Sequence, residues 1–258
     1  MKNFDDKRAG TGTMEWAEVT ENIQLGCANG CLYCYAAHMA ARFGRKARED
    51  WTREELTKRA EMKSYPAKGG VIMFPSTHDI TPFNVEACLR VLRLMLEKGN
   101  KLLITSKPRP EIIHHLCEQL EKYCEQILFR FTIGSLDNDT LKFWEPGAPC
   151  LGERISALEI ACAYDFRTSV SAEPLLGGRA MALDLIDRLE PLVSDTIWIG
   201  KLNKGRIRVF PMTDESRRRL QEIELLQADR EMSSLVLEAT GHPKVRWKES
   251  IRAVVDAT

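Results

Sequence analysis

The sequence predicts an α/β protein, built as a partial (β/α)6 barrel with a short C-terminal α/β extension. Two observations predict this fold class. Short runs rich in β-branched and aromatic residues alternate along the chain with stretches whose apolar residues recur at helical spacing. These runs number six up to residue 200, and the alternation with helices is typical of a parallel sheet. Right-handed crossovers curl such a sheet toward a barrel, which six units leave open and eight units close.

The expected elements come in a regular order. Strands are expected at 21–26, 71–74, 101–105, 126–133, 168–172 and 196–200. Helices are expected between them, at 35–48, 85–98, 110–123, 152–163 and 179–189. Gly99 and Asn100 mark the end of the second helix, because both residues are common just past a helix C-terminus. After residue 200 we expect a charged helix at 213–229, a β-like run at 235–238 and a last helix at 247–255.

This pattern divides the chain into three parts. Residues 1–15 form an N-terminal tail, residues 16–200 form the barrel core, and residues 201–258 form the C-terminal extension. No Pro-, Gly- or Ser-rich linker separates the extension from the core. We therefore expect the extension to lie against the barrel and close its open side.

The composition indicates a soluble protein without a general attraction to nucleic acid or membranes. Hydrophobic residues make up 44% and charged residues 29% of the chain, and the basic and acidic residues total 37 each. The net charge of zero provides no overall field toward anionic partners. No apolar run approaches the ~20 residues of a membrane helix, and the N-terminus lacks the apolar segment of a secretory signal. We expect a cytoplasmic protein with no membrane partner.

Three clustered cysteines carry the main functional signal. Cys27, Cys31 and Cys34 have the spacing C-x3-C-x2-C, between the first expected strand and the first expected helix. Three thiolates on one loop can hold an iron–sulfur cluster, and backbone N–H groups of the loop can hydrogen-bond its sulfides. Three ligands on a four-iron cluster leave one iron open to bind another molecule. The other five cysteines, at positions 88, 117, 124, 150 and 162, are scattered, and we expect them to be small buried residues.

Two other interpretations of this motif remain open. A ferredoxin cluster requires a fourth cysteine, but the position four residues after Cys34 is His38. The three cysteines with His38 match a Cys3His zinc knuckle, which would indicate a nucleic-acid-binding module without catalysis. Zinc knuckles are usually small and self-contained, whereas this motif lies in the first βα loop of a large α/β chain.

The motif C-x3-C-x-aromatic-C, in which Tyr33 is the aromatic residue, resembles the signature of the radical S-adenosylmethionine superfamily. The resemblance covers roughly residues 16–200. It implies an open (β/α)6 barrel with one [4Fe–4S] cluster on the three cysteines, and S-adenosylmethionine bound to the open iron. It also implies reductive cleavage of that cofactor to methionine and a 5′-deoxyadenosyl radical, with an external electron donor of the flavodoxin or ferredoxin type.

Polar residues at the strand ends are the candidate contacts of S-adenosylmethionine, because the carboxyl ends of the strands form the active face of βα folds. The candidates are Tyr33, Ser76, Thr77, Asp79, Ser135, Arg154 and Glu173. By the resemblance, Ser76, Thr77 and Asp79 hold the amino group, since an ammonium needs acceptors. Glu173 can accept from ribose hydroxyls or hold a charged partner. Arg154 either pairs with the methionine carboxylate or forms a surface ion pair on its own helix.

A basic run begins where the sixth expected strand ends. It comprises Lys201, Lys204, Arg206, Arg208, Arg217, Arg218 and Arg219, against only Asp214 and Glu215 up to residue 219. Such a run suits a substrate that carries phosphate, such as a nucleotide, RNA or DNA. The alternative is a loop followed by a solvated helix face. Phe210 is the only aromatic residue in the run, so the sequence does not strongly indicate single-strand binding.

Later motifs resemble the branch of spore photoproduct lyase and related phage-borne proteins. They are Ser76-Thr77-His78-Asp79, Thr105-Ser106-Lys107, Glu145-Pro146 with Glu153-Arg154, and Glu173-Pro174. That lyase family uses a cysteine just past the second strand to return a hydrogen atom, but no cysteine occurs here between Cys34 and Cys88. We therefore predict the same scaffold and radical initiation without the repair reaction, and modification of a nucleic acid, nucleotide or other small polar substrate.

Overall fold

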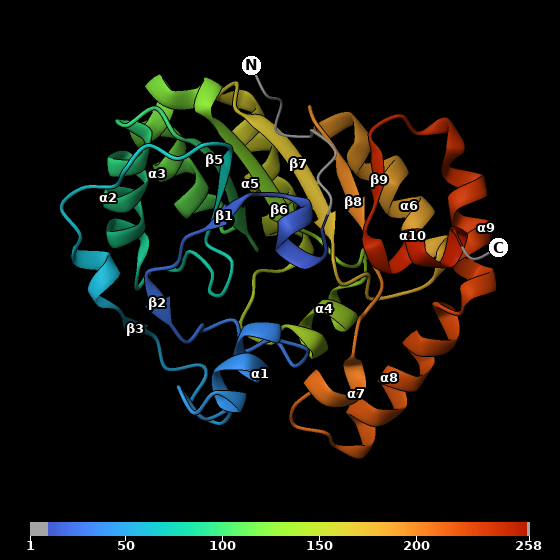
Figure 1. Ribbon diagram of the computed structural model, residues 1–258. Coiled ribbons are helices and arrows are strands. Elements are labelled where there is room, and N and C mark those ends of the chain that lie inside the picture. The colour runs from blue at the N-terminus through green and yellow to red at the C-terminus, as the bar shows by residue number, and fades with distance from the viewer. Residues whose placement is uncertain (1–9, 257–258) are drawn as a thin grey trace.

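The computed structural model describes residues 10–256 and confirms the predicted α/β class (Figure 1). Seven parallel strands form one sheet, and their order in the sheet is their order in the chain. They are β1 (Val19–Thr20), β4 (Val71–Phe74), β5 (Lys101–Ser106), β6 (Ile127–Thr132), β7 (Arg167–Ala172), β8 (Ile197–Ile199) and β9 (Val245–Trp247). Since β1 and β9 are the two edges, the barrel is open. A separate antiparallel pair consists of β2 (Gln24–Leu25) and β3 (Glu55–Leu56).

Helices fill the connections between the strands. In the core they are α1 (Tyr35–Arg42), α2 (Val85–Leu96), α3 (Pro110–Leu120), α4 (Asn138–Trp144), α5 (Leu151–Ala163) and α6 (Arg179–Leu189). After β8 follow α7 (Gly205–Arg208), α8 (Asp214–Leu226), α9 (Asp229–Glu238) and α10 (Glu249–Val255). Short 3-10 turns lie at Gly12–Glu15, Lys58–Glu61, Glu121–Gln126, Glu190–Leu192 and Ala239–Gly241. Among the described residues, no helix is long and apolar enough to cross a membrane.

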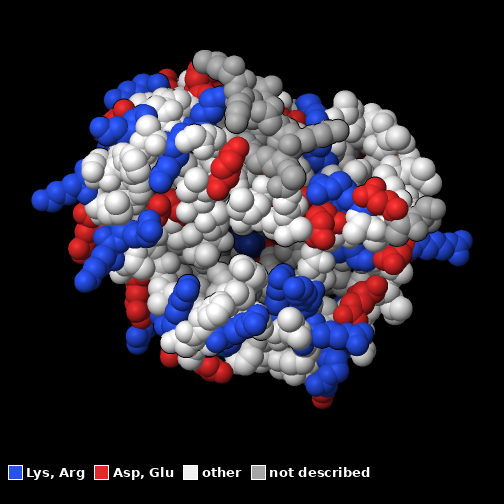
Figure 2. Space-filling model, viewed as in Figure 1, with Lys and Arg blue, Asp and Glu red and all other residues white. Residues whose placement is uncertain are grey.

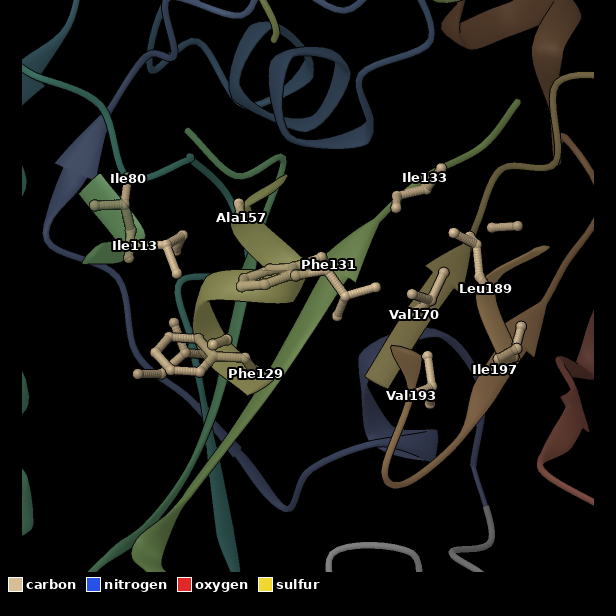
Figure 3. Packing of buried hydrophobic residues seen from close by; sticks show 14 of the residues in the cluster. Ile80, Ile113, Phe129, Phe131, Ile133, Ala157, Val170, Leu189, Val193 and Ile197 are labelled. Carbon is tan, nitrogen blue, oxygen red and sulfur yellow. The ribbon is translucent and has the colours of Figure 1, made fainter. Parts of the chain in front are cut away.

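The strands are buried on both faces, as expected for a parallel sheet covered by helices. Ile72 and Phe74 of β4 point to the main core under the helices, whereas the alternating Met73 belongs to a second cluster inside the barrel. Figure 3 shows Phe129 and Phe131 of β6 beside helix α5 in the main core. The inner cluster contains Trp16, Val71, Met73, Leu103, Leu128 and Trp198. Side chains therefore fill the barrel interior, and the strand ends remain for the site.

The prediction of the first strand is wrong in position. β1 is Val19–Thr20, and Gln24–Leu25 leaves the sheet to pair with Glu55–Leu56. The helix expected at 35–48 ends at Arg42, because Gly44 adopts a left-handed conformation with φ of 62° just beyond it. Helix α4 was not predicted, and its N-cap is Asp137, whose carboxylate accepts from Thr140 N at 2.8 Å.

The C-terminal extension differs most from the prediction. The expected β-like run at 235–238 lies inside α9, which buries Met232 and Leu235 three residues apart on one face. The strand that does form is Val245–Trp247, where we expected the start of the last helix. It pairs with β8 in parallel register, with Ile199 opposite Trp247. The extension thus adds a strand to the core sheet.

Candidate active site

The cysteine loop, which we define as residues 26–34, connects β2 to α1. It lies near the carboxyl ends of the first strands of the seven-stranded sheet. Cys27 is buried, whereas Cys31 and Cys34 are half-buried. Cys34 is the N-cap of α1, and its Sγ accepts a hydrogen bond from Ala37 N at 3.4 Å. Gly30 has a φ of 56°, which few other residues adopt at low cost. The loop therefore ends at the N-terminus of α1, with Cys34 as the capping residue.

Backbone hydrogen bonds fix the cysteine loop to segments distant in sequence. Cys27 N donates to Trp51 O at 2.8 Å, and Leu32 N donates to Trp144 O at 2.9 Å. These bonds satisfy loop groups that would otherwise be buried without partners. The loop is consequently positioned by residues that follow α1 and by the end of α4.

The turn after α4 contacts the cysteine loop directly. Gly147 N donates to Asn29 O at 3.0 Å, and a Cβ atom at Gly147 would lie 2.2 Å from Ala28 O. Arg109 also reaches both segments, with Nη2 2.8 Å from Gly147 O and 3.4 Å from Asn29 Oδ1. Only glycine fits at position 147, so this turn helps to set the position of the cysteines.

Glu145 lies at the centre of a buried charge cluster beside the cysteine loop. Its carboxylate accepts hydrogen bonds from the Tyr33 hydroxyl and from Arg154 Nη2, the latter at 2.5 Å. The Lys107 ammonium lies 3.8 Å away and also 5.8 Å from the centre of the Tyr33 ring. Burial alone would raise the pKa of Glu145, but Lys107 and Arg154 hold it below its ordinary value. Glu145 is therefore a carboxylate that joins the cysteine loop to β5 and α5.

Arg154 is fully buried, so the predicted alternative of a surface ion pair on its helix is wrong. Besides the bond to Glu145, it donates to Pro149 O at 2.8 Å and to Thr132 O at 3.1 Å. These contacts engage all three nitrogens of the guanidinium, which is buried away from solvent. We assign Arg154 to positioning Glu145 rather than to contact with a cofactor carboxylate.

Lys107 is better placed for an anionic group, although the sequence analysis gave it no role. It follows β5 directly, and its side chain retains 15% of its surface exposed. Burial alone would lower the pKa of Lys107, but Cys31, Glu145 and Asp79 raise it above its ordinary value. The ammonium is therefore charged. The signal in the sequence was a lysine immediately after a predicted strand, within Thr105-Ser106-Lys107.

Asp79 joins three parts of the site. One carboxylate oxygen accepts from Asn29 Nδ2 at 2.7 Å and Lys107 N at 2.9 Å. The other accepts from Ile80 N at 2.8 Å and from the Ser106 hydroxyl. Burial raises the pKa of Asp79, while Lys107 and the bond from Ser106 act in the opposite direction. Since both oxygens already accept two hydrogen bonds, Asp79 orients the cysteine loop and the end of β5 rather than offering free acceptors.

Ser76 and Thr77 remain accessible at the end of β4. Asn22 Oδ1 accepts from both of their backbone N–H groups, at 2.7 and 2.8 Å, and its Nδ2 donates to the Ser76 hydroxyl at 2.9 Å. Both side chains are half-buried, and within residues 10–256 the Thr77 hydroxyl has no hydrogen-bond partner. These two hydroxyls are therefore available to a ligand at the strand ends.

The remaining two predicted contacts follow β6 and β7. Ser135 is buried, accepts from Asp137 N at 3.1 Å, and lines a cavity of about 450 Å³ between α4, α6 and α8. Glu173 lies 3.3 Å from the ammonium of Lys248, which comes from the C-terminal extension. Burial raises the pKa of Glu173, and Lys248 opposes that effect. Both residues lie at strand ends, as predicted, but Lys248 was not foreseen.

The thiols fit a cluster that supplies positive charge. Burial raises the pKa of Cys27 above its ordinary value and that of Cys31 to about 12. As thiolates they therefore require a cationic partner, which iron provides. In the described part of the chain, no three His, Cys, Asp or Glu side chains converge on one point as a single metal ion needs. The thiolates of a four-iron cluster each bind a different iron, so they need not meet at one point.

Figure 2 shows a hollow near the middle of the molecule, with a basic side chain at its floor. Further Lys and Arg side chains gather below the hollow, over α1 and α7. The site described above is built from the cysteine loop and from the loops that follow β4, β5, β6 and β7, whose carboxyl ends share this end of the sheet. We refer to this end as the mouth.

A family model described as the Radical SAM superfamily matches residues 22–182, which include every cysteine of the motif. This chain belongs to the radical SAM superfamily. The match covers more than half of the chain, and the three cysteines, the parallel sheet and the open barrel agree with it.

Similar proteins agree with this assignment. An uncharacterized protein of Acidianus two-tailed virus, ORF301, is 24% identical over 193 residues, covering 69% of this chain and 63% of its own. A structure of spore photoproduct lyase with a dinucleoside spore photoproduct matches 86% of this chain and 64% of its own, with 14% identity and a TM-score of 0.54. A cysteine-to-alanine variant of that lyase matches 95% of this chain and 79% of its own, with 15% identity and a TM-score of 0.52. The chain thus spans just under two thirds of the length of the first two relatives, and the lyase structures show a shared fold.

Proposed function

We propose that this protein binds one [4Fe–4S] cluster through Cys27, Cys31 and Cys34 and cleaves S-adenosylmethionine reductively to methionine and a 5′-deoxyadenosyl radical. The observation that carries the proposal is the three-cysteine loop, braced at the mouth of an open parallel barrel in a member of the radical SAM superfamily. When bound, the cluster supplies the electron that breaks a carbon–sulfur bond of the cofactor. An external flavodoxin or ferredoxin would supply that electron to the protein.

The protein's own residues would bind and orient the cofactor. Ser76 and Thr77 offer hydroxyl acceptors for its amino group, and Lys107 offers a cation for its carboxylate. Tyr33, Ser135 and Glu173 are the further candidate contacts. Asp79 and Arg154 would position the site without contacting the cofactor, because their polar atoms already bind the protein groups that hold the cysteine loop.

The reaction on the substrate would be the modification of a nucleic acid, nucleotide or other small polar molecule in the cytoplasm. The zinc-knuckle alternative loses support because the superfamily model covers the motif.

Release of 5′-deoxyadenosine tests the proposal. Anaerobically reconstituted protein should hold about four irons per chain and release 5′-deoxyadenosine from S-adenosylmethionine when dithionite is added. Cys34→Ala should abolish the release, whereas Cys124→Ala, which changes a half-buried cysteine outside the site, should not. Protein with a complete cluster that yields no 5′-deoxyadenosine would refute the proposal.

The repair reaction of spore photoproduct lyase is not part of the proposal. After β4 the chain reads Pro75 to Asp79 without a cysteine. Cys88 is buried on α2 beside Asn84, and Cys150 is exposed at the start of α5. A hydroxyl cannot replace the thiol as hydrogen donor, because its O–H bond is much stronger than S–H.

An oligonucleotide that contains spore photoproduct tests directly whether the protein lacks the repair reaction. Reduced, cluster-loaded protein should yield no more than traces of thymine monomers from it. Multiple-turnover repair that survives Cys150→Ala would show that the hydrogen donor lies elsewhere.

A further inference from the structure

Three exposed aromatic rings lie beside the mouth, and each has an arginine guanidinium over one face. The rings come from α1, from the segment after α1 and from the segment after α7. We name this the arginine–aromatic surface, and it consists of Tyr35, Phe43 and Phe210 with Arg42, Arg45, Arg48 and Arg208.

The contacts are close, yet the rings remain open to solvent. The Arg208 guanidinium lies 5.0 Å from the Tyr35 ring centre, and the Arg48 guanidinium lies 5.1 Å from that of Phe210. Arg45 lies 5.5 Å from the centre of the Phe43 ring. The exposed fractions of the rings are 52% for Tyr35, 37% for Phe210 and 58% for Phe43. An exposed aromatic ring can stack with a flat ring of a ligand, so these rings are candidates for stacking.

The surface is fixed to the cysteine loop. Arg48 Nη2 donates to Arg208 O at 2.6 Å and to Leu32 O at 3.3 Å. Phe210 N donates to the same Leu32 O at 2.9 Å. Two segments about 160 residues apart are thereby joined next to Cys31. Figure 2 shows the corresponding gathering of basic side chains below the hollow, over α1 and α7.

The positive charge of this surface is not neutralised by the protein. Within residues 10–256, no carboxylate lies at ion-pair distance from Arg42, Arg45, Arg48 or Arg208. The arginines of α8 differ, since Arg217 pairs with Asp214 at 2.7 Å and Arg218 pairs with Glu215 at 2.7 Å. The predicted phosphate site on the 201–219 run therefore loses most of its free charge, and the arginine–aromatic surface combines Arg208 of that run with three arginines in and after α1.

We propose that the arginine–aromatic surface binds a single-stranded nucleic acid and presents one nucleotide to the mouth. A single strand needs cations for its phosphates and flat rings on which its bases stack, and this surface alternates the two. An acidic electron-donor protein would need the cations but not a separate open face on each of three rings. The inference rests on the proposed function, because it names the substrate class of that enzyme.

Fluorescence anisotropy of labelled oligothymidylate and oligouridylate tests the proposal on cluster-loaded protein. Binding should weaken as salt rises, and the two oligonucleotides distinguish DNA from RNA as the ligand. Arg42→Gln with Arg45→Gln should lower the slope of log affinity against log salt by about 1.4, since each phosphate contact of a single strand contributes about 0.7. Phe43→Ala should weaken binding about fivefold or more without changing the slope, because it removes a base stack and no charge.

The matched control is Arg217→Gln with Arg218→Gln, which removes the same charge from α8. This pair should leave both affinity and slope unchanged. All variants change exposed side chains, and equal iron content and thermal midpoints would establish that they fold. The proposal is overturned if neither oligonucleotide binds at low salt, if the α8 pair loses as much affinity as the α1 pair, or if only the binding of an acidic flavodoxin depends on Arg42 and Arg45.

Failure of this proposal is distinguishable from failure of the proposed function. Oligonucleotide binding is measured without S-adenosylmethionine or reductant, so it does not require radical chemistry. Release of 5′-deoxyadenosine is measured without oligonucleotide, and the surface variants should release it at the wild-type rate.

Discussion

Glu145→Gln should destabilise the protein strongly, because it removes the carboxylate that pairs with two cations of the charge cluster, Arg154 and Lys107. The side chains of Glu145 and Arg154 are 0% and 1% exposed, and that of Lys107 is 15% exposed. Removing one member of a buried ion pair costs about 3–5 kcal/mol, since the remaining charge is left without compensation. A urea m-value of about 1–3 kcal/mol/M converts this loss into a fall of at least about 1 M in the unfolding midpoint.

Anaerobic urea unfolding of the cluster-loaded protein, followed by circular dichroism, measures this effect. Iron content should also fall, because Glu145 anchors the cysteine loop through the Tyr33 hydroxyl, and a neutral amide at this position no longer forms an ion pair with Arg154 and Lys107. Glu159→Gln is the control, since it changes an exposed carboxylate on α5 and should alter stability by less than about 0.5 kcal/mol. Combining Glu145→Gln with Arg154→Met should cost less than the sum of the single changes, because the unpaired cation is removed. A loss below about 1 kcal/mol, or strict additivity, would show that the cluster is more hydrated than its burial indicates.

Three further predictions concern other parts of the site. Gly147→Ala should reduce iron content, because the added Cβ would lie 2.2 Å from Ala28 O. Gly152→Ala is the control and should not reduce it, because its Cβ would lie 4.0 Å from the nearest atom. Equal iron content in the two variants would contradict the role of the turn after α4. Burial lowers the pKa of His78 from 6.5 to about 4, so the unfolded chain takes up this proton first, and stability that is complete above pH 6.5 should fall by up to about 3 kcal/mol as the pH decreases to 4. His78→Gln keeps an acceptor for Ile23 N and should flatten that part of the pH profile in denaturant titrations; an unchanged profile would assign it to other groups. Lys248→Met should cost about 3–5 kcal/mol, because Glu15 and Glu173 would lose their shared cation, and a thermal midpoint equal to the wild type would refute this.

Local pattern was sufficient for the parts of the fold with strong periodicity. β4, β5, β6 and β8 were predicted because each contains a short, continuous apolar run between helices, as in Val71–Phe74, whereas β7 has no such run and lies between two predicted helices. β1 and β9 were missed because neither Val19–Thr20 nor Val245–Trp247 contains a continuous apolar run. The segment at 235–238 resembles a strand locally, but burial of Met232 and Leu235 against the core places it in a helix, since tertiary packing outweighs weak local propensity.

Some features of the site could likewise be predicted from the sequence, and others could not. The spacing of Cys27, Cys31 and Cys34 lies within one loop and was readable from the sequence. The environment of Glu145 was not, because its partners come from the cysteine loop, the end of β5 and α5. The charge of the basic run depends on the fold in the same way. Arg206 is paired with Glu224, which lies past the counted residues, so part of the charge that looked free in the sequence is neutralised in the fold.

The C-terminal segment belongs to the site even though the superfamily match ends at residue 182. Phe210 N supplies a hydrogen bond to Leu32 O in the cysteine loop, and Lys248 holds Glu173 at the end of β7. Val245–Trp247 covers the edge of β8, which would otherwise expose unpaired backbone groups. These three contacts come from three different elements, so no single short segment could supply all of them. The common core of the superfamily thus provides the cysteines, while residues beyond it complete the mouth, and we expect specificity for the substrate to reside there.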